Sequence, residues 1–290
     1  MILSVGEILL DIYAKENLSS LDMNARIGGA PFNVAANIAR NGGNVSFYGA
    51  IGKDGFGSFL AKEAEAYPFQ KLLLHETEYP TTLALVSLRS GERSFSFLRG
   101  ADFHLSGKRL EDFSLKSGDI IHVGSLMLNE EEGARFFLKT RAFARKKGVY
   151  LSLDINIRPT LFENQNEARY VFEAVCPCVD FLKASEEDLE FLGMSPEELK
   201  NRYMKEKSIL FVSRSSKGSD VYIGNEHYSV SSKKIDVLDS TGAGDAFYGR
   251  ILLELDQCSD PYALSAQKMK EILTKANEDG ANACLHQGAL

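Results

Sequence analysis

Cysteine and histidine are scarce in this chain, with four cysteines and five histidines among 290 residues, and tryptophan is missing. Four cysteines are too few for a disulfide framework in a chain of this length. Cys176 and Cys178 flank a proline, whereas Cys258 and Cys284 are isolated, and no group of cysteines and histidines has the spacing of a zinc site. We therefore expect free thiols rather than disulfides or a structural metal site.

Long apolar runs are also missing, because no uninterrupted stretch approaches the roughly 18 residues that span a bilayer. Glu7 and Asp11 interrupt the apolar amino terminus, so we expect no secretory signal. The net charge of −7 gives no basis for nucleic-acid binding. With 44% hydrophobic and 25% charged residues, the composition is typical of a globular protein. We expect a cytoplasmic protein with no membrane and no nucleic-acid partner.

Two common nucleotide-binding motifs are absent from the sequence. There is no Gly-x4-Gly-Lys-Ser/Thr segment, and no Gly-x-Gly-x-x-Gly follows the first predicted strand. Residues 52–57 (Gly-Lys-Asp-Gly-Phe-Gly) resemble a phosphate loop only superficially and are expected to form a strand-to-helix turn. Repeats and Pro/Ser-rich linkers are also lacking, so we expect a single domain over residues 1–290.

Short apolar runs alternate with longer helical patterns through most of the chain. The predicted strands cover residues 2–5, 45–50, 120–123, 149–154, 181–183 and 209–213. The predicted helices cover residues 31–40, 56–66, 130–147, 166–174 and 195–205. This alternation predicts an α/β fold with a mainly parallel sheet and helices on both faces. Ligands of such folds bind outside the carboxyl ends of the strands.

Three segments depart from this rhythm. Residues 81–89 and 93–99 alternate apolar with polar side chains, which predicts a β-hairpin that turns at residues 90–92. A further strand is predicted from residue 12 to about residue 25. Together these segments, approximately 12–25 and 81–100, predict a small β-sheet inserted in the α/β core. We favour a lid that excludes water from an active site, and an edge extension without function is the alternative.

The most informative stretch covers residues 239–247, Asp-Ser-Thr-Gly-Ala-Gly-Asp-Ala-Phe. Apolar residues at helical spacing follow it, which predicts a helix N-terminus, where unpaired N–H groups and the helix dipole attract anions. Gly242, Ala243 and Gly244 let a phosphate oxygen approach the backbone closely. Asp245 is then placed to take a proton from a hydroxyl that attacks a phosphoryl group. A tight turn with a helix-capping aspartate is the alternative.

A second polar group lies near the amino terminus. Asp11 follows the first predicted strand, and residues 28–33 (Gly-Gly-Ala-Pro-Phe-Asn) open the next predicted helix. A carboxylate at Asp11 and an amide at Asn33 offer an acceptor and a donor, which suits the neighbouring hydroxyls of a sugar. A Gly-Gly-x-Pro turn is also common as plain architecture.

With both ends considered, the chain resembles the ribokinase-like carbohydrate kinases, also called the phosphofructokinase-B family, and most of all the fructokinases. The likeness covers nearly the whole chain and implies a three-layer α/β/α core with a β-sheet lid. The matching motifs are residues 6–11 (Gly-Glu-Ile-Leu-Leu-Asp), 28–35 (Gly-Gly-Ala-Pro-Phe-Asn-Val-Ala), 91–93 (Gly-Glu-Arg), 99–102 (Arg-Gly-Ala-Asp), 154–158 (Asp-Ile-Asn-Ile-Arg) and 239–245.

The resemblance implies a role for individual residues. The catalytic base would be Asp245, with an anion hole formed by Gly242, Ala243 and Gly244. The sugar would be held by Asp11, Gly28, Gly29 and Asn33, with Arg99 and Asn156 or Arg158 nearby. ATP would be contacted by Lys217, Gly218, Asn277 and Gly280. A monovalent-cation loop, with K⁺ as the candidate ion, would include Asp239, Thr241 and Gly288. The resemblance also allows a homodimer formed through the lid.

Two motifs differ from the family pattern. The family's Asn-x-x-Glu, linked to Mg²⁺ and phosphate, is here residues 185–188 (Ser-Glu-Glu-Asp), in which Glu187 or Asp188 could supply the acid. The usual Thr-x-Gly-x-x-Gly nucleotide loop is residues 213–218 (Ser-Arg-Ser-Ser-Lys-Gly), and the loss of its first glycine could reshape the nucleotide pocket.

The sequence favours an ATP-dependent kinase of a free sugar, with fructose phosphorylated on its primary hydroxyl as the first hypothesis. A kinase of another sugar, such as 2-keto-3-deoxygluconate or ribose, is the second, because lid contacts determine substrate choice. A sugar-binding protein that has kept the fold and lost the chemistry is the third. The intact residues 242–245 argue against that last interpretation.

Overall fold

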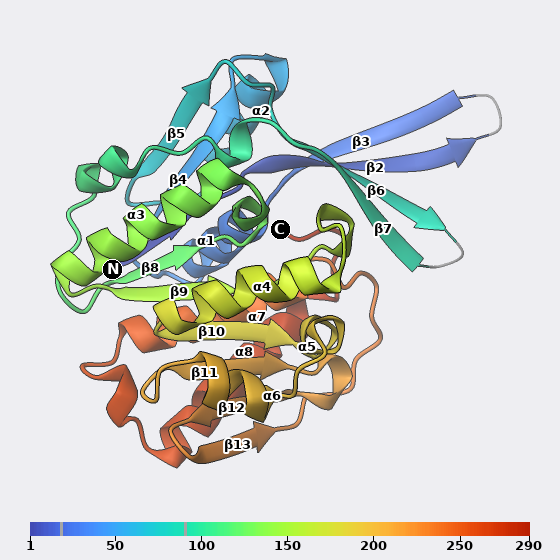
Figure 1. Cartoon of the computed structure of the whole chain (residues 1–290). Coiled ribbons are helices and arrows are strands. Elements are labelled where there is room, and N and C mark those ends of the chain that lie inside the picture. The colour runs from blue at the N-terminus through green and yellow to red at the C-terminus, as the bar shows by residue number, and fades with distance from the viewer. Residues whose placement is uncertain (18–19, 90–91) are drawn as a thin grey trace.

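Strands of the main sheet carry apolar residues on both faces, as a sheet covered on two sides requires. In the computed structural model, which describes residues 1–17, 20–89 and 92–290, Ile2 of β1 (Ile2–Val5) belongs to one buried cluster and Leu3 to another. Ile120 and Ile121 of β8 (Ile120–Val123) divide in the same way. The sheet is therefore the middle layer of a three-layer α/β/α core, as predicted (Figure 1).

Nine strands of the described chain form this sheet, in the order β13-β12-β11-β10-β9-β8-β1-β4-β5. All neighbours are parallel except β11 with β12 and β12 with β13, which are antiparallel. The remaining strands of the sheet are β4 (Val45–Gly52), β5 (Leu72–Thr77), β9 (Tyr150–Asp154), β10 (Phe181–Ser185), β11 (Ile209–Ser213), β12 (Ser219–Ile223) and β13 (Glu226–Val230).

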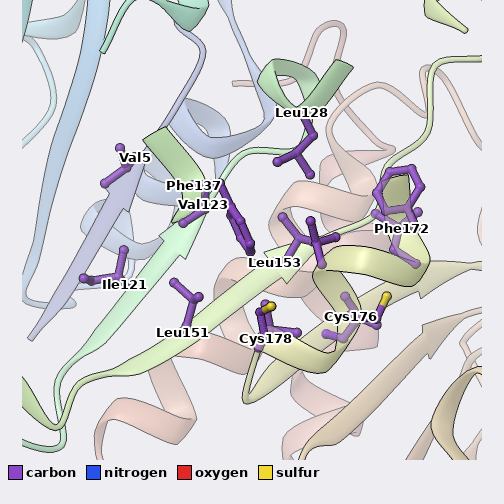
Figure 2. Packing of buried hydrophobic residues seen from close by; sticks show 14 of the residues in the cluster. Val5, Ile121, Val123, Leu128, Phe137, Leu151, Leu153, Phe172, Cys176 and Cys178 are labelled. Carbon is purple, nitrogen blue, oxygen red and sulfur yellow. The ribbon is translucent and has the colours of Figure 1, made fainter. Parts of the chain in front are cut away.

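Helices cover both faces of this sheet. One buried cluster lies under α1 (Ala30–Arg40), α2 (Gly55–Ala64), α7 (Ala243–Asp256) and α8 (Ala266–Ala283). The other lies under α3 (Glu131–Lys147), α4 (Gln165–Val175) and α5 (Glu186–Leu192). Figure 2 shows part of this second cluster, which includes Phe137 of α3, Phe172 of α4 and Leu153 of β9. None of the helices in the described ranges combines the length and apolarity needed to cross a membrane.

A second, four-stranded sheet projects from the core (Figure 1). It consists of β2 (Leu9–Asn17), β3 (Ser20–Gly28), β6 (Leu83–Arg89) and β7 (Glu92–Leu98), in the order β3-β2-β6-β7. β2 and β6 are parallel, whereas β2 with β3 and β6 with β7 form antiparallel hairpins. The predicted pairing of the two segments around residues 90–92 is confirmed, although residues 90–91 lie outside the described ranges.

Some sequence-based predictions of elements were wrong. The single strand expected over residues 12–25 is two antiparallel strands. The prediction missed the turn because residues 17–20 (Asn-Leu-Ser-Ser) contain no glycine or proline, although asparagine and serine are also common in turns. The helix expected over residues 195–205 is present over residues 196–203, but only α6 (Pro196–Glu198) is α-helical, and Leu199–Tyr203 continues it as a π-helical turn. Strands β5, β12 and β13 and helices α5 and α8 had not been predicted.

A buried polar chain attaches α7 to the sheet. The hydroxyl groups of Tyr248 on α7 and Ser152 on β9 lie 2.7 Å apart, and Ser152 Oγ lies 3.2 Å from Nδ1 of His122 on β8. The rings of His122 and Tyr248 also meet edge to face, with centroids 5.3 Å apart. Because α7 carries the 242–245 motif in its first turn, this chain helps to fix the motif against the sheet.

Replacing Tyr248 with phenylalanine should lower the free energy of unfolding by about 1 kcal/mol, since a buried hydrogen bond is lost while the ring packing stays. Urea denaturation followed by circular dichroism measures the change. Tyr170→Phe is the matched control, because Tyr170 is 76% exposed and its replacement should change nothing. Equal stability of the two variants would contradict the structural role of the buried chain.

Candidate active site

One cavity of about 290 Å³ lies where loops after β1 and β9 meet the amino ends of α1 and α7. The small sheet supplies three of its lining side chains, from β2 and β7. This position, at the carboxyl ends of parallel strands, is the one that the sequence predicted. The lining consists of Glu7, Leu9, Asp11, Gly29, Ala30, Asn33, Phe97, Ser125, Leu126, Asn156, Arg158, Lys183, Ser240, Thr241, Gly242, Gly244 and Asp245.

The two motifs singled out from the sequence meet in this cavity. Asn33, in the first turn of α1, donates a hydrogen bond from Nδ2 to Oδ2 of Asp245, in the first turn of α7, at 2.8 Å. Both side chains are more than 90% buried. Asn33 therefore holds the carboxylate in one orientation and leaves the other oxygen of Asp245 for a ligand.

Burial makes two aspartates of the cavity more basic than usual. It raises the pKa of Asp245, although the hydrogen bond from Asn33 and the charges of Lys183 and Arg158 oppose the change. Burial also raises the pKa of Asp11 to about 7, against the charge of Arg158. A carboxylate with a raised pKa is a stronger proton acceptor than an exposed one.

Lys183 is a cavity residue that the sequence analysis missed. It lies on β10, is 4% exposed, and its Nζ is 3.0 Å from Oδ2 of Asp154 on the neighbouring strand β9. Burial alone would lower the pKa of Lys183, but the carboxylates of Asp154 and Asp188 raise it, so the ammonium stays charged. A lysine within the otherwise apolar strand Phe-Leu-Lys-Ala-Ser was the available signal, because lysine is almost never fully buried without a partner.

The first turn of α7 needs its small residues. Gly242 has φ 77°, and a Cβ there would lie 2.6 Å from Cα of Ala289 in the carboxyl-terminal segment. A Cβ on Gly244 would lie 3.2 Å from Nζ of Lys183. The space between this ammonium and the N–H groups of the first turn is therefore kept open by glycine, and both surroundings favour an anion.

Two buried polar atoms of the cavity lack a hydrogen-bond partner within the described chain, namely Oε2 of Glu7 and Oδ1 of Asn33. Burial raises the pKa of Glu7 to about 8, so at neutral pH this carboxyl is largely protonated and can donate. The amide oxygen of Asn33 can only accept. Buried polar atoms are normally paired. Hydroxyl groups of a ligand can both donate and accept, so they could accept a hydrogen bond from Glu7 and donate one to Asn33.

Asn156 and Arg158 both line the cavity, so the structure brings together the two residues that the sequence left as alternatives. Nη1 of Arg158 donates to Oδ1 of Asn156 at 2.7 Å. Asn156 has φ 37°, an unusual backbone conformation for a residue other than glycine. This bend after β9 directs both side chains to the same cavity.

Arg99 lies outside the cavity lining. Its guanidinium donates to Asp102 at 2.6 Å and to Oδ1 of Asn129 at 2.9 Å, and Asp102 is fully buried. Gly28 also lies behind the lining, where a Cβ would approach Oδ2 of Asp11 to 2.2 Å. These two predicted sugar residues therefore support the cavity wall without facing the cavity.

Two of the predicted ATP residues meet at one backbone group. A Cβ on Gly218, which has φ 103°, would approach the carbonyl oxygen of Val230 to 2.0 Å, and Nδ2 of Asn277 donates to the same oxygen at 3.3 Å. Lys217 is exposed and forms an ion pair with Glu186 at 3.0 Å.

Gly280 lies beside the 242–245 motif. A Cβ on it would be 3.1 Å from the carbonyl oxygen of Ala243 and 3.4 Å from Cβ of Phe247. Helix α8 thus packs closely on the first turn of α7, and the predicted ATP residues extend from this turn to β13.

The acidic residues at the start of α5 have different environments. Both carboxylate oxygens of Asp188 accept backbone hydrogen bonds at 2.7 Å, from the N–H groups of Ile157 and Ser185. Glu187 is exposed and accepts a long hydrogen bond of 3.4 Å from the hydroxyl of Ser215. Of the two candidates, Glu187 has the freer oxygens for a metal ion.

The predicted cation-loop residues are joined by one carboxylate. Asp239 accepts a hydrogen bond from the N–H of Thr241 at 2.8 Å and from the N–H of Gly288 at 3.0 Å. Arg26 of β3 donates to the carbonyl oxygen of Gln287 at 2.6 Å. The small sheet, the carboxyl-terminal segment and the loop before α7 are therefore connected.

Within the described ranges, no group of three His, Cys, Asp or Glu side chains is arranged to hold a metal.

The raised pKa of Glu7 makes stability depend on pH. Its pKa is about 8 in the folded protein against an ordinary value of 4.5, so between these values the unfolded chain has lost a proton that the folded chain retains. Rising pH therefore destabilises the folded state across this window.

Replacing Glu7 with glutamine should make the fall in unfolding free energy between pH 5 and pH 8 shallower. Urea denaturation at a series of pH values tests this expectation. Asp11 contributes a similar trend to both proteins, so only the difference between them reports on Glu7. Glu65→Gln, at an exposed glutamate, should match the original protein, and a Glu7→Gln profile with the same slope would show that Glu7 is ionised in the folded state.

The whole chain, residues 1–290, matches the model of the pfkB family carbohydrate kinases. Fructokinase-1 of Oryza sativa subsp. japonica is 32% identical over 303 aligned residues, which cover 100% of this chain and 93% of that protein. Probable fructokinase-4 of Arabidopsis thaliana is 33% identical over 309 residues, with 100% and 92% covered.

Two solved structures are similar over almost the full length. A double-mutant fructokinase from Vibrio cholerae O395, with fructose, ADP and a potassium ion bound, has a TM-score of 0.85 and 28% identity, covering 99% of this chain and 93% of that one. Fructokinase from Xylella fastidiosa with bound ATP has a TM-score of 0.83 and 30% identity, with the same coverage. Because the family model spans the full chain and relatives above 30% identity align with all of it, the chain belongs to the pfkB family of carbohydrate kinases.

Proposed function

We propose that this protein transfers the γ-phosphoryl group of ATP to the primary hydroxyl of fructose, which gives fructose 6-phosphate and ADP. One observation carries the proposal: the buried carboxylate of Asp245 lies in the first turn of α7, inside a cavity with unpaired groups suited to hydroxyls. The choice of fructose is supported by the fructokinases similar to this chain, including one with bound fructose.

In the proposed reaction, Asp245 acts as general base. It accepts the proton of the primary hydroxyl while that oxygen bonds to the γ-phosphorus, and the bond from phosphorus to the bridging oxygen of ATP breaks so that ADP leaves with the electron pair. The raised pKa of Asp245 suits a base that works near neutral pH. The hydrogen bond from Asn33 keeps the carboxylate aimed at the sugar.

The transferring phosphoryl group would lie between the first turn of α7 and Lys183. N–H groups of Gly242, Ala243 and Gly244 would form the anion hole, with Lys183 adding a full positive charge from the opposite side. Because Lys183 is already fixed by Asp154, its charge is preorganised and needs no rearrangement during the reaction.

For the sugar, we propose direct contacts from Asp11, Gly29, Asn33 and the pair Asn156 and Arg158, all of which line the cavity. Arg99 and Gly28 would act indirectly. Arg99 holds Asp102 and Asn129 behind the cavity, and Gly28 leaves room for the carboxylate of Asp11.

For the nucleotide, we propose the surface formed by Lys217, Gly218, Asn277 and Gly280. It leads from β13 to the first turn of α7, which fits a ligand whose terminal phosphate reaches that turn.

Mg²⁺ is usually bound by substrate phosphates with one or two carboxylates, and the exposed Glu187 fits such a ligand. When bound, the ion would offset negative charge on the phosphates. Carbonyl groups of the junction between Asp239, Thr241 and Gly288 would hold K⁺.

We also propose that the four-stranded sheet is a lid that closes over the sugar and serves as the contact surface of a homodimer. Phe97 of β7 lines the cavity, while Met23 of β3 and Leu98 of β7 are more than half exposed. Exposed apolar side chains on edge strands are suited to pairing with a second copy.

ATP consumption by the purified protein, measured against a panel of free sugars with Mg²⁺ and K⁺, tests the proposed function. Turnover with fructose well above ribose and 2-keto-3-deoxygluconate is expected. Turnover on another sugar alone would replace the substrate and keep the mechanism. Sugar binding without ATP consumption would contradict the kinase assignment.

Replacing Asp245 with asparagine should lower kcat by about 10²–10⁴, the usual contribution of a general base, with little change in fructose binding. Steady-state kinetics and sugar-binding calorimetry measure the two effects. Asp236→Asn, at an exposed aspartate, is the matched control and should behave as the original protein. A kcat within a few-fold of normal in the Asp245 variant would exclude this residue as the base.

A further inference from the structure

A second, larger cavity lies at the opposite edge of the main sheet. Its volume is about 480 Å³, and it opens at the amino ends of β9, β10 and β11, where Tyr150, Asp180 and Ser208 lie at or next to the first strand residue. We call it the basal cavity. The lining side chains that matter here are the cations Arg141, Arg145, Lys205 and Lys207, the carboxylate of Asp180 and the rings of Tyr150 and Tyr262.

Positive charge dominates this lining. Four cations, Arg141, Arg145, Lys205 and Lys207, face a single carboxylate, Asp180. The whole chain has the opposite balance, with 33 basic and 40 acidic residues. A local excess of this kind in an acidic protein attracts anions to one place.

The single carboxylate is already used by the fold. Oδ2 of Asp180 accepts the N–H of Leu151 at 2.8 Å, and Oδ1 accepts the hydroxyl of Tyr262 at 3.0 Å, whereas Nζ of Lys205 is 3.6 Å away. Within the described part of the chain, Arg141, Arg145 and Lys207 form no ion pair. The four cations are exposed, and with Asp180 the lining side chains carry a net charge of about +3, with Asp260 as a further carboxylate near Tyr150 and Tyr262.

Surface solvation explains only part of this arrangement. Arg145 is in the last turn of α3, where a cation offsets the negative end of the helix dipole. Arg141, one turn earlier, places a like charge at i, i+4, which destabilises a helix by about 0.2–0.5 kcal/mol without a counter-charge. Lys205 and Lys207 come from a separate segment before β11, yet line the same cavity.

The walls of the basal cavity favour a small ligand over a polymer. Tyr150 and Tyr262 stand edge to face with ring centroids 5.6 Å apart and form an aromatic wall. The cavity has the volume of a small-molecule site, and a nucleic acid would meet the negative charge of the surrounding protein. A guanidinium group, such as that of Arg141 or Arg145, can donate two parallel hydrogen bonds to two oxygens of one phosphate.

We infer that the basal cavity is a second binding site, separate from the active site, for a small polyanion that carries two phosphoryl groups. Arg141 and Arg145 bind one phosphoryl group from α3, and Lys205 and Lys207 bind the other from the segment before β11. This inference does not rest on the proposed function, since no residue of the basal cavity belongs to the active-site lining.

Isothermal titration calorimetry with inorganic pyrophosphate at physiological ionic strength tests the inference. The original protein should show a class of sites that is lost, or weakened at least tenfold, in the double variant Arg141→Ala with Arg145→Ala. The control double variant, Arg135→Ala with Lys146→Ala, removes the same charge from α3 outside the cavity lining and should bind as the original protein.

Thermal unfolding and kcat of both double variants show whether the fold and the active site are intact. Pyrophosphate that binds at the active site would still bind to both variants, so only the loss of a second class of sites reports on the basal cavity. Equal weakening in the two double variants would mean that pyrophosphate senses only general charge, and would overturn the inference. So would unchanged binding in the Arg141 and Arg145 variant.

Discussion

A buried hydrogen bond between Asn33 and Asp245 joins two halves of the site that are 212 residues apart in the sequence. It can form only because α1 and α7 begin at the same edge of the sheet and pack against each other along their length. The distance between the proposed sugar-binding residues of α1 and the proposed anion hole of α7 is thereby fixed. The other contacts of the site position groups around this pair.

The electrostatics of the cavity follow from burial. Removing Asp11, Asp245 and Glu7 from water raises the pKa of each carboxyl, whereas Lys183 keeps its charge through Asp154. Isolated buried charges are costly, and a buried ion pair often adds little stability. A site with this many ionisable groups is therefore better explained by catalysis than by folding, because the fold would be served as well by apolar residues.

The carboxyl-terminal segment connects the small sheet to the first turn of α7. Arg26 of β3 binds the carbonyl oxygen of Gln287, the next residue binds Asp239, and Gly242 lies against Ala289. A movement of the small sheet would therefore shift the carboxyl-terminal segment that packs against the proposed anion hole. If the small sheet is a lid, as proposed, this connection would couple its closure to the geometry of the proposed anion hole.

The sequence by itself determined the α/β alternation and the family motifs, and it supplied the proposed role of residues 242–245, because each depends on local patterns of apolar spacing and small residues. It also indicated a small sheet, but as one hairpin and one strand, since residues 17–20 contain no glycine or proline to mark a second turn. Tertiary structure decided which oxygens are free. Asp188 has both of its oxygens bound to backbone N–H groups, Arg99 lies behind the cavity wall, and Lys183 reaches the cavity from mid-strand. Only the parallel sheet, by bringing strand ends together, creates these contacts between residues that are distant in sequence.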